Sequence, residues 1–239
     1  MDESRAATAA AFRTVRWRSP WLVPGSLLLI LALLTINALT GGPLAGADRR
    51  IRAVVQAHAS AWPWLSQGRL APAQMIVDLG NNQAAIPVLA VCALIVVARR
   101  QTLRPLLSAA VAVVLLLVTV IPAKILIARS GPGLGPVAAG HLGVFPSGHA
   151  STSSVCYGLA VLLLATVLPA RIAVAAVAAV AGVCFLVGVA LVWCDYHWCT
   201  DVVAGWALAG IIIQVAMRLA QPPGPGPGRS RNDHGTRPG

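Results

Sequence analysis

Long apolar runs alternate with short polar or basic stretches along most of the 239-residue chain. Each of six such runs reaches the length of about 20 residues that an α-helix needs to cross the hydrocarbon core of a bilayer. We predict membrane-spanning helices over residues 21–39, 80–98, 106–127, 150–168, 172–192 and 199–217. The expected fold class is therefore all-α, a polytopic membrane protein with six transmembrane helices in one bundle.

The segments outside these runs are polar ends and one mixed stretch. We interpret residues 1–20 as a basic cytoplasmic N-terminus, residues 21–218 as the six-helix membrane domain, and residues 219–239 as a disordered tail rich in Pro, Gly and Arg. Residues 41–80 are mixed in polarity, and we predict an amphipathic helix on the membrane surface followed by a loop. A substrate-access lid is the functional alternative for this stretch.

Composition agrees with a membrane location. The chain is 57% hydrophobic and 10% charged, with a net charge of +11, whereas a soluble domain carries about a quarter charged residues. Its basic residues flank the apolar runs instead of gathering on one polar face, which argues against nucleic acid binding. Twelve of them lie on the side of the termini and six on the opposite side. The positive-inside rule predicts a multi-pass protein of the cell membrane with both termini in the cytoplasm, and loops 129–149 and 193–201 outside.

The five cysteines give no reason to expect a metal or a cofactor, and we expect neither. No CxxC-type spacing is present, and three of the cysteines lie within apolar runs, where a thiol behaves as a small hydrophobic side chain. Cys194 and Cys199 lie close together beside a polar loop and could form a disulfide if that loop is extracytoplasmic. The sequence leaves this pairing open.

Polar side chains gather in three clusters on the predicted outer side. Lys124 and Arg129 follow the third run, Pro146-Ser147-Gly148-His149 precedes the fourth, and His197 and Asp201 precede or open the sixth. Ionisable groups near membrane depth are energetically costly, so each cluster is a functional hypothesis.

The second cluster predicts a helix start that binds a phosphate. Ser is a favoured N-cap, and the N–H groups of a first helical turn attract anions. We expect the Ser147 hydroxyl and the Gly148 N–H to contact the phosphate, and the side chains of Lys124 and Arg129 to bind its oxygens.

His197 and Asp201 are four residues apart, so they share one face if both lie on a helix. A carboxylate on one imidazole nitrogen fixes the tautomer and leaves the other nitrogen free to attack. We interpret His197 as a nucleophile that forms a phosphohistidine, Asp201 as its orienting partner, and His149 as the acid that protonates the leaving oxygen. A His–Asp pair that only caps a helix end is the structural alternative.

Together the three clusters resemble the signature motifs of the type 2 phosphatidic acid phosphatase superfamily, over roughly residues 21–218. The resemblance implies a six-helix membrane phosphatase that acts on lipid phosphates or diphosphates without a metal. It implies catalytic roles for His197, Asp201 and His149. It also implies phosphate-binding roles for Lys124, Ser147 and Gly148. Phosphatidic acid, phosphatidylglycerophosphate and polyprenyl diphosphate are the substrates we consider.

Two positions depart from the family motifs. Gly131 stands where the first motif has an arginine, and Leu191 stands where the third motif has one. Arg129 lies two residues before Gly131 and is a candidate replacement. The departures leave two alternatives open, namely a lipid phosphotransferase of the same fold and a non-catalytic lipid-phosphate binder.

Overall fold

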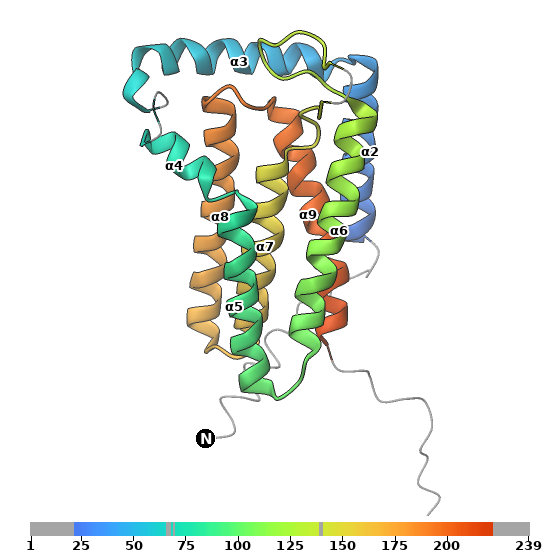
Figure 1. Cartoon of the computed structure of the whole chain (residues 1–239), viewed down its shortest axis with the longest axis vertical. Coiled ribbons are helices and arrows are strands. Elements are labelled where there is room, and N and C mark those ends of the chain that lie inside the picture. Colours follow the sequence, from blue (N-terminus) through green and yellow to red (C-terminus); the bar gives the residue numbers. More distant parts are fainter. Residues whose placement is uncertain (1–21, 66–67, 69, 139–140, 222–239) are drawn as a thin grey trace, which may run out of the picture.

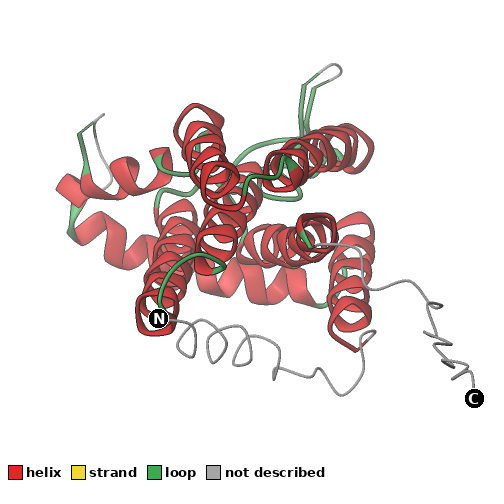
Figure 2. Cartoon of the chain, turned by 90° about the horizontal axis from the view of Figure 1, so that it is seen from below, coloured by secondary structure: helices red, strands yellow, loops and turns green. Residues whose placement is uncertain are grey.

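The computed structural model describes residues 22–65, 68, 70–138 and 141–221. Six helices in these ranges are long and apolar enough to cross a membrane. They are α2 (Leu22–Thr40), α5 (Asn82–Arg100), α6 (Arg104–Ile127), α7 (Gly148–Ala165), α8 (Ala170–Trp193) and α9 (Cys199–Ala220). They form one bundle (Figure 1, Figure 2), so the predicted all-α polytopic membrane fold is confirmed. The predicted polar ends, residues 1–20 and nearly all of 219–239, lie outside the described residues.

The observed helix bounds differ from the predicted runs by at most three residues, for reasons that lie in the flanking residues. Helix α7 begins at Gly148, because Ser147 is extended and its Oγ accepts a hydrogen bond from the Ala150 N–H at 3.3 Å. Helix α6 ends at Ile127, because Ala128 adopts a left-handed conformation with φ of 45°. Helix α8 begins directly after Pro169, which cannot donate a backbone hydrogen bond.

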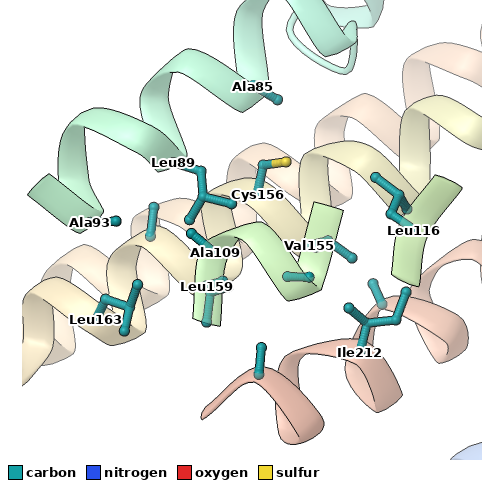
Figure 3. Close-up of a cluster of buried hydrophobic side chains, with 14 of the residues drawn as sticks. Ala85, Leu89, Ala93, Ala109, Leu116, Val155, Cys156, Leu159, Leu163 and Ile212 are labelled. Carbon is teal, nitrogen blue, oxygen red and sulfur yellow. The ribbon is translucent and has the colours of Figure 1, made fainter. Parts of the chain in front are cut away.

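Helix α7 is the centre of the bundle and contacts α5, α6, α8 and α9. Its buried side chains Leu159 and Leu163 pack against alanines and leucines of the neighbouring helices, as Figure 3 shows. Alanines on α5 and α6 allow the helix backbones to approach α7 closely. Close van der Waals packing matters here, because lipid provides no hydrophobic driving force between helices. The buried alanines of this cluster on those two helices are Ala85, Ala93, Ala109 and Ala112.

Residues 41–80 fold as a surface helix followed by two shorter helices. Helix α3 (Leu44–Ala61) lies across one end of the bundle (Figure 1). The 3₁₀ helix η1 (Pro63–Leu65) and helix α4 (Pro72–Asp78) follow, where a loop was expected. Pro72 stands at the first position of α4, where its missing N–H has no intrahelical partner to lose.

Helix α3 directs polar side chains towards the bundle. Asp48 is buried and Arg52 is partly buried on the face towards the bundle, whereas Ile51 and Val54 are 39% and 60% exposed. Polar side chains of α3 are therefore directed at the end of the bundle, whereas its exposed side carries apolar side chains together with Arg49 and Arg50. This direction indicates polar partners beneath α3.

Gly205 allows α9 to approach the start of α7. A Cβ at Gly205 would lie 3.0 Å from both the Ser147 carbonyl oxygen and Ser151 Oγ. We expect Gly205→Ala to lower the midpoint of thermal unfolding in detergent, because overpacking typically costs about 1–3 kcal/mol.

The control for this variant is Gly182→Ala on α8, where a Cβ would meet nothing within 4 Å. It should leave the midpoint unchanged or raise it, since Ala is a better helix former than Gly by about 1 kcal/mol. A Gly205→Ala protein as stable as the Gly182→Ala protein would contradict the close contact between α7 and α9.

Candidate active site

The residues predicted to form the site come together at the end of the bundle that α3 covers. They lie at the C-terminal end of α6, in the loop after it, at the N-terminal ends of α7 and α9, and in the turn between α8 and α9 (Figure 1). These residues are Lys124, Arg129, Ser147, Gly148, His149, His197 and Asp201.

The loop between α6 and α7 folds back onto the end of α6. Gly143 donates its N–H to the Lys124 carbonyl oxygen at 3.1 Å. A Cβ at Gly143 would lie 2.7 Å from the Arg129 backbone nitrogen, so the close approach requires glycine. Lys124 Nζ donates to the Gly143 carbonyl oxygen at 3.0 Å, and its Cε lies 3.6 Å from where a Cβ of Gly148 would be. The ammonium group is thus held beside the start of α7.

The start of α7 is fixed by bonds on both sides of Ser147. The buried Ser147 donates its N–H to the Asp201 carbonyl oxygen at 3.0 Å, and its carbonyl oxygen accepts from Ser151 Oγ at 2.7 Å. These bonds tie the first turn of α7 to the first turn of α9. The N–H groups of Gly148 and His149 open α7 at the positive end of its dipole, which suits an anion.

His149 is oriented by a residue that the sequence did not single out. Its Nε2 lies 2.9 Å from Asn81 Oδ1, and Asn81 Nδ2 donates to Asp78 Oδ1 at 3.2 Å. Because the Asp78 carboxylate accepts from the amide nitrogen, the amide oxygen faces His149, so His149 Nε2 is the donor. A Cβ at Gly80 would lie 2.8 Å from His149 Cβ, which shows how closely the turn before α5 packs here. His149 lies within electrostatic range of His197 and Lys124.

His197 lies in the turn before α9 and not on the helix, and its imidazole faces the Asp201 carboxylate in the first turn of α9. His197 is 8% exposed, and its Nδ1 lies 3.5 Å from Asp201 Oδ2. This distance is longer than an ordinary hydrogen bond, and Nδ1 is a buried atom with no hydrogen-bond partner among the described residues. The same Oδ2 accepts the Trp198 N–H at 3.0 Å at the start of α9. Asp201 therefore caps α9 and also faces the imidazole, so both interpretations of the pair agree with the geometry.

Arg129 is held by protein groups on both branches of its guanidinium. Nη1 bonds to Asp201 Oδ1 and to Thr200 Oγ1, the latter at 2.7 Å, and Nη2 bonds to Asp48 Oδ2 at 2.7 Å. Its Cζ also lies 5.6 Å from the centre of a Trp198 ring, a cation–π distance. A phosphate-binding role for Arg129 stays a prediction, and these contacts favour a role inside the protein.

Apolar contacts occupy the two positions where the family motifs have arginine. A Cβ at Gly131 would lie 3.1 Å from Leu134 Cδ1 and 3.3 Å from Val144 Cγ1. Leu191 is fully buried in a cluster that also contains Val77 of α4 and Ala150 of α7. Neither position offers a cation to a bound phosphate.

The few acidic residues of the sequence could have indicated further residues of the site. The chain has seven, and four of them lie in the described part, namely Asp48, Asp78, Asp195 and Asp201. All four lie near the α3 end and have polar partners. The Asp195 carboxylate accepts two hydrogen bonds from Arg52 of α3, at 2.8 and 2.6 Å, and raises the pKa of that guanidinium above its ordinary value.

All five cysteines lie in the described residues, and each is a free thiol. Cys194 and Cys199 are therefore not joined in this structure. Burial raises the pKa of the Cys194 thiol above its ordinary value, so this thiol remains protonated near neutral pH.

Comparison with known proteins establishes the family and the fold of the chain. No curated protein matches the chain. A similar solved structure is that of a transmembrane PAP2 type phosphatidylglycerolphosphate phosphatase from Bacillus subtilis, with a TM-score of 0.69, 23% sequence identity, and coverage of 82% of this chain and 94% of that chain. This likeness confirms the fold. The family model of the PAP2 superfamily matches residues 101–224, more than half of the sequence. The chain, a multi-pass membrane protein, thus belongs to the PAP2 superfamily.

Proposed function

We propose that this protein is an integral membrane phosphatase that hydrolyses a lipid phosphate or a polyprenyl diphosphate through a phosphohistidine. The observation that carries the proposal is the convergence of His197, its partner Asp201, His149 and Lys124 at the start of α7. Membership of a phosphatase superfamily supports the reaction class. No metal or cofactor takes part in the proposed steps.

In the first step, His197 attacks phosphorus through Nε2, because Nδ1 faces Asp201. A nitrogen–phosphorus bond forms as the bond to the lipid oxygen breaks, and His149 gives that oxygen a proton. In the second step, a water molecule gives a proton to His149 and attacks phosphorus. The nitrogen–phosphorus bond breaks, which releases inorganic phosphate and restores the free imidazole of His197. Lys124 and the first N–H groups of α7 stabilise the negative charge that develops on the phosphoryl oxygens.

An apolar groove beside the site supports a lipid substrate. It has a volume of about 640 Å³ and lies between α2, α6 and α9. Its wall includes Phe145 and Pro146, the two residues that precede Ser147. A chain in this groove would leave its phosphate near the start of α7. The groove is lined by Leu31, Thr35, Leu39, Thr119, Pro122, Ala123, Leu126, Ile127, Phe145, Pro146 and Leu208.

We propose that the α3 end faces the extracytoplasmic side of the cell membrane and that both termini are cytoplasmic. At the opposite end, Arg99, Arg100 and Arg104 surround the turn between α5 and α6, and Arg171 and Arg218 lie near the ends of α8 and α9. Basic residues in short loops favour the cytoplasmic side. In the same scheme, residues 21–218 form the phosphatase domain, with polar segments at both ends.

A non-catalytic lipid-phosphate binder is the second candidate. The observation that favours it is the apolar surroundings of Gly131 and Leu191, together with the two carboxylates that neutralise Arg129. Such a site holds phosphate with fewer cations than the family motifs provide. The intact His197, Asp201 and His149 favour catalysis over this alternative.

The first test is phosphate release by the purified protein in detergent with EDTA. The substrates are phosphatidic acid, phosphatidylglycerophosphate and polyprenyl diphosphate, and the His197→Ala variant is assayed in parallel. We expect release that persists in EDTA and is lost in the variant, because the nucleophile is a side chain. Release by His197→Ala at the wild-type rate would overturn the mechanism. Transfer of phosphate to a second lipid without free phosphate would indicate a phosphotransferase.

The second test fills the apolar groove. Thr35 of α2 lines the groove, and Thr35→Trp should raise KM for a long-chain lipid phosphate while leaving KM for a short, water-soluble phosphate ester unchanged. Leu33→Trp is the matched control, because Leu33 lies on the same helix, is 56% exposed and does not line the groove. Equal KM values for both variants with the lipid would show that the chain lies elsewhere.

A further inference from the structure

We propose that Asp48 of α3 is a positioning residue for the His197–Asp201 pair and acts on it through Arg129. The inference rests on the proposed function, in which His197 is the nucleophile. Asp48 lies outside residues 101–224, the segment that matches the family. Helix α3 would thus supply a functional carboxylate to a site that is otherwise built by the matched segment.

Asp48 is a buried charge with three polar contacts. It is 2% exposed, its Oδ2 lies 2.7 Å from Arg129 Nη2 and 2.6 Å from Thr200 Oγ1, and its Oδ1 accepts the Thr200 N–H at 3.1 Å. Burying a charge is unfavourable unless it is well paired, and a buried ion pair is often no more stabilising than apolar packing. Stability alone is therefore a weak reason for a carboxylate at this position.

The guanidinium of Arg129 joins Asp48 to Asp201. One branch contacts Asp48 and the other contacts Asp201 Oδ1. Because the guanidinium is planar and its donors are fixed in direction, the two carboxylates hold each other's orientation. With Oδ1 held, Asp201 Oδ2 is directed at the Trp198 N–H and at His197 Nδ1.

Charge provides the second part of the argument. When His197 attacks phosphorus, its imidazole gains positive charge, and a negative Asp201 stabilises it. Arg129 alone would cancel the charge of Asp201. With Asp48 as a second carboxylate, the group Asp48–Arg129–Asp201 has a formal charge of −1 beside His197. Asp48 thereby keeps negative charge available to the nucleophile.

Asp48 also ties α3 to the bundle, so the test must separate this role from positioning. The neighbouring turns of α3 have similar ties: Arg52 pairs with Asp195, and Gln56 Nε2 donates to the Trp193 carbonyl oxygen at 3.2 Å. Arg52 lies on the same face of α3, four residues after Asp48, and has no contact with Arg129 among the observed bonds of its side chain. Arg52→Gln is therefore a matched control that weakens the docking of α3 on the turn between α8 and α9 and leaves the bonds of Asp48 to Arg129 and Thr200 in place.

The variant that removes the charge with the smallest change in shape is Asp48→Asn. Its amide oxygen can still accept the Thr200 N–H, while its amide nitrogen replaces the oxygen that accepts from Arg129 Nη2. We expect kcat to fall by about 10-fold to 100-fold, the range typical of residues that orient the ligands of a metal site from behind, with little change in KM. The acidic limb of the pH–rate profile should move to lower pH, because the protonated imidazole loses a stabilising negative charge. Arg52→Gln should keep the wild-type kcat and pH profile.

The profile reports on His197 among several charged neighbours. Some of these charged groups face His197 directly, and others lie behind its partner Asp201. They come from α9, α7, α6, the loop after α6, and α3. They are Asp201, His149, Lys124, Arg129 and Asp48. Among these only the charge of Asp48 differs between wild type and Asp48→Asn, so a shift of the limb is assigned to that charge.

The double variant Asp48→Asn/Arg129→Gln tests the charge argument directly. It removes one charge of each sign, so Asp201 keeps its charge. We expect kcat and the acidic limb to return part of the way towards wild type. No recovery, with a raised KM, would indicate that Arg129 binds phosphate and would overturn the proposal. Equal losses of kcat and thermal midpoint in Asp48→Asn and Arg52→Gln would show that Asp48 only docks α3.

A measurement without turnover separates this inference from the proposed function. Histidine NMR of the detergent-solubilised protein, with the His197 signal assigned by its loss in His197→Ala, follows the protonation of His197. We expect the Asp48→Asn titration to move to lower pH, and no movement overturns the inference. A wild-type protein that releases no phosphate would overturn the proposed phosphatase activity, while this titration would still decide the role of Asp48.

Discussion

The arrangement at the α3 end depends on one guanidinium held between two carboxylates. Arg129 joins Asp48 and Asp201, so a single side chain connects the surface helix, the end of α6 and the start of α9. Its side chain is 12% exposed, and the Asp201 side chain is fully buried. Charges that are screened so little from one another interact strongly, and each is unfavourable if left unpaired. The three elements therefore hold one another in register.

Packing of the central helix sets the distances on which this site relies. Helix α7 contacts four neighbouring helices, and its first residues meet α9 where Gly205 leaves room for the Ser147 carbonyl oxygen. The bond from the Ser147 N–H to the Asp201 carbonyl oxygen then joins the two helix starts directly. The proposed mechanism, which binds an anion at one helix start and places a nucleophile beside the next, needs this rigidity.

Much of the fold and part of the site could be predicted from sequence alone. Six apolar runs predicted the six long helices, because the bilayer sets both their length and their backbone hydrogen bonding. The spacing of four residues predicted that His197 and Asp201 lie close together, although His197 lies before α9 and not on it. The serine cap at Ser147 followed from local backbone chemistry, which needs no distant partner. These features depend on neighbouring residues or on the solvent.

The partners that lie far apart along the chain were decided by tertiary structure. Asp48 meets Arg129 across 81 positions, and Asn81 meets His149 across 68. Hydrophobic periodicity and sequence motifs reveal which residues share a face of one helix, but they do not reveal which helices pack against each other. The sequence by itself determined the six long helices, the membrane class and the candidate chemistry. Only the packed bundle decided that Arg129 faces two carboxylates and that α3 reaches the site, because those contacts depend on how the elements pack.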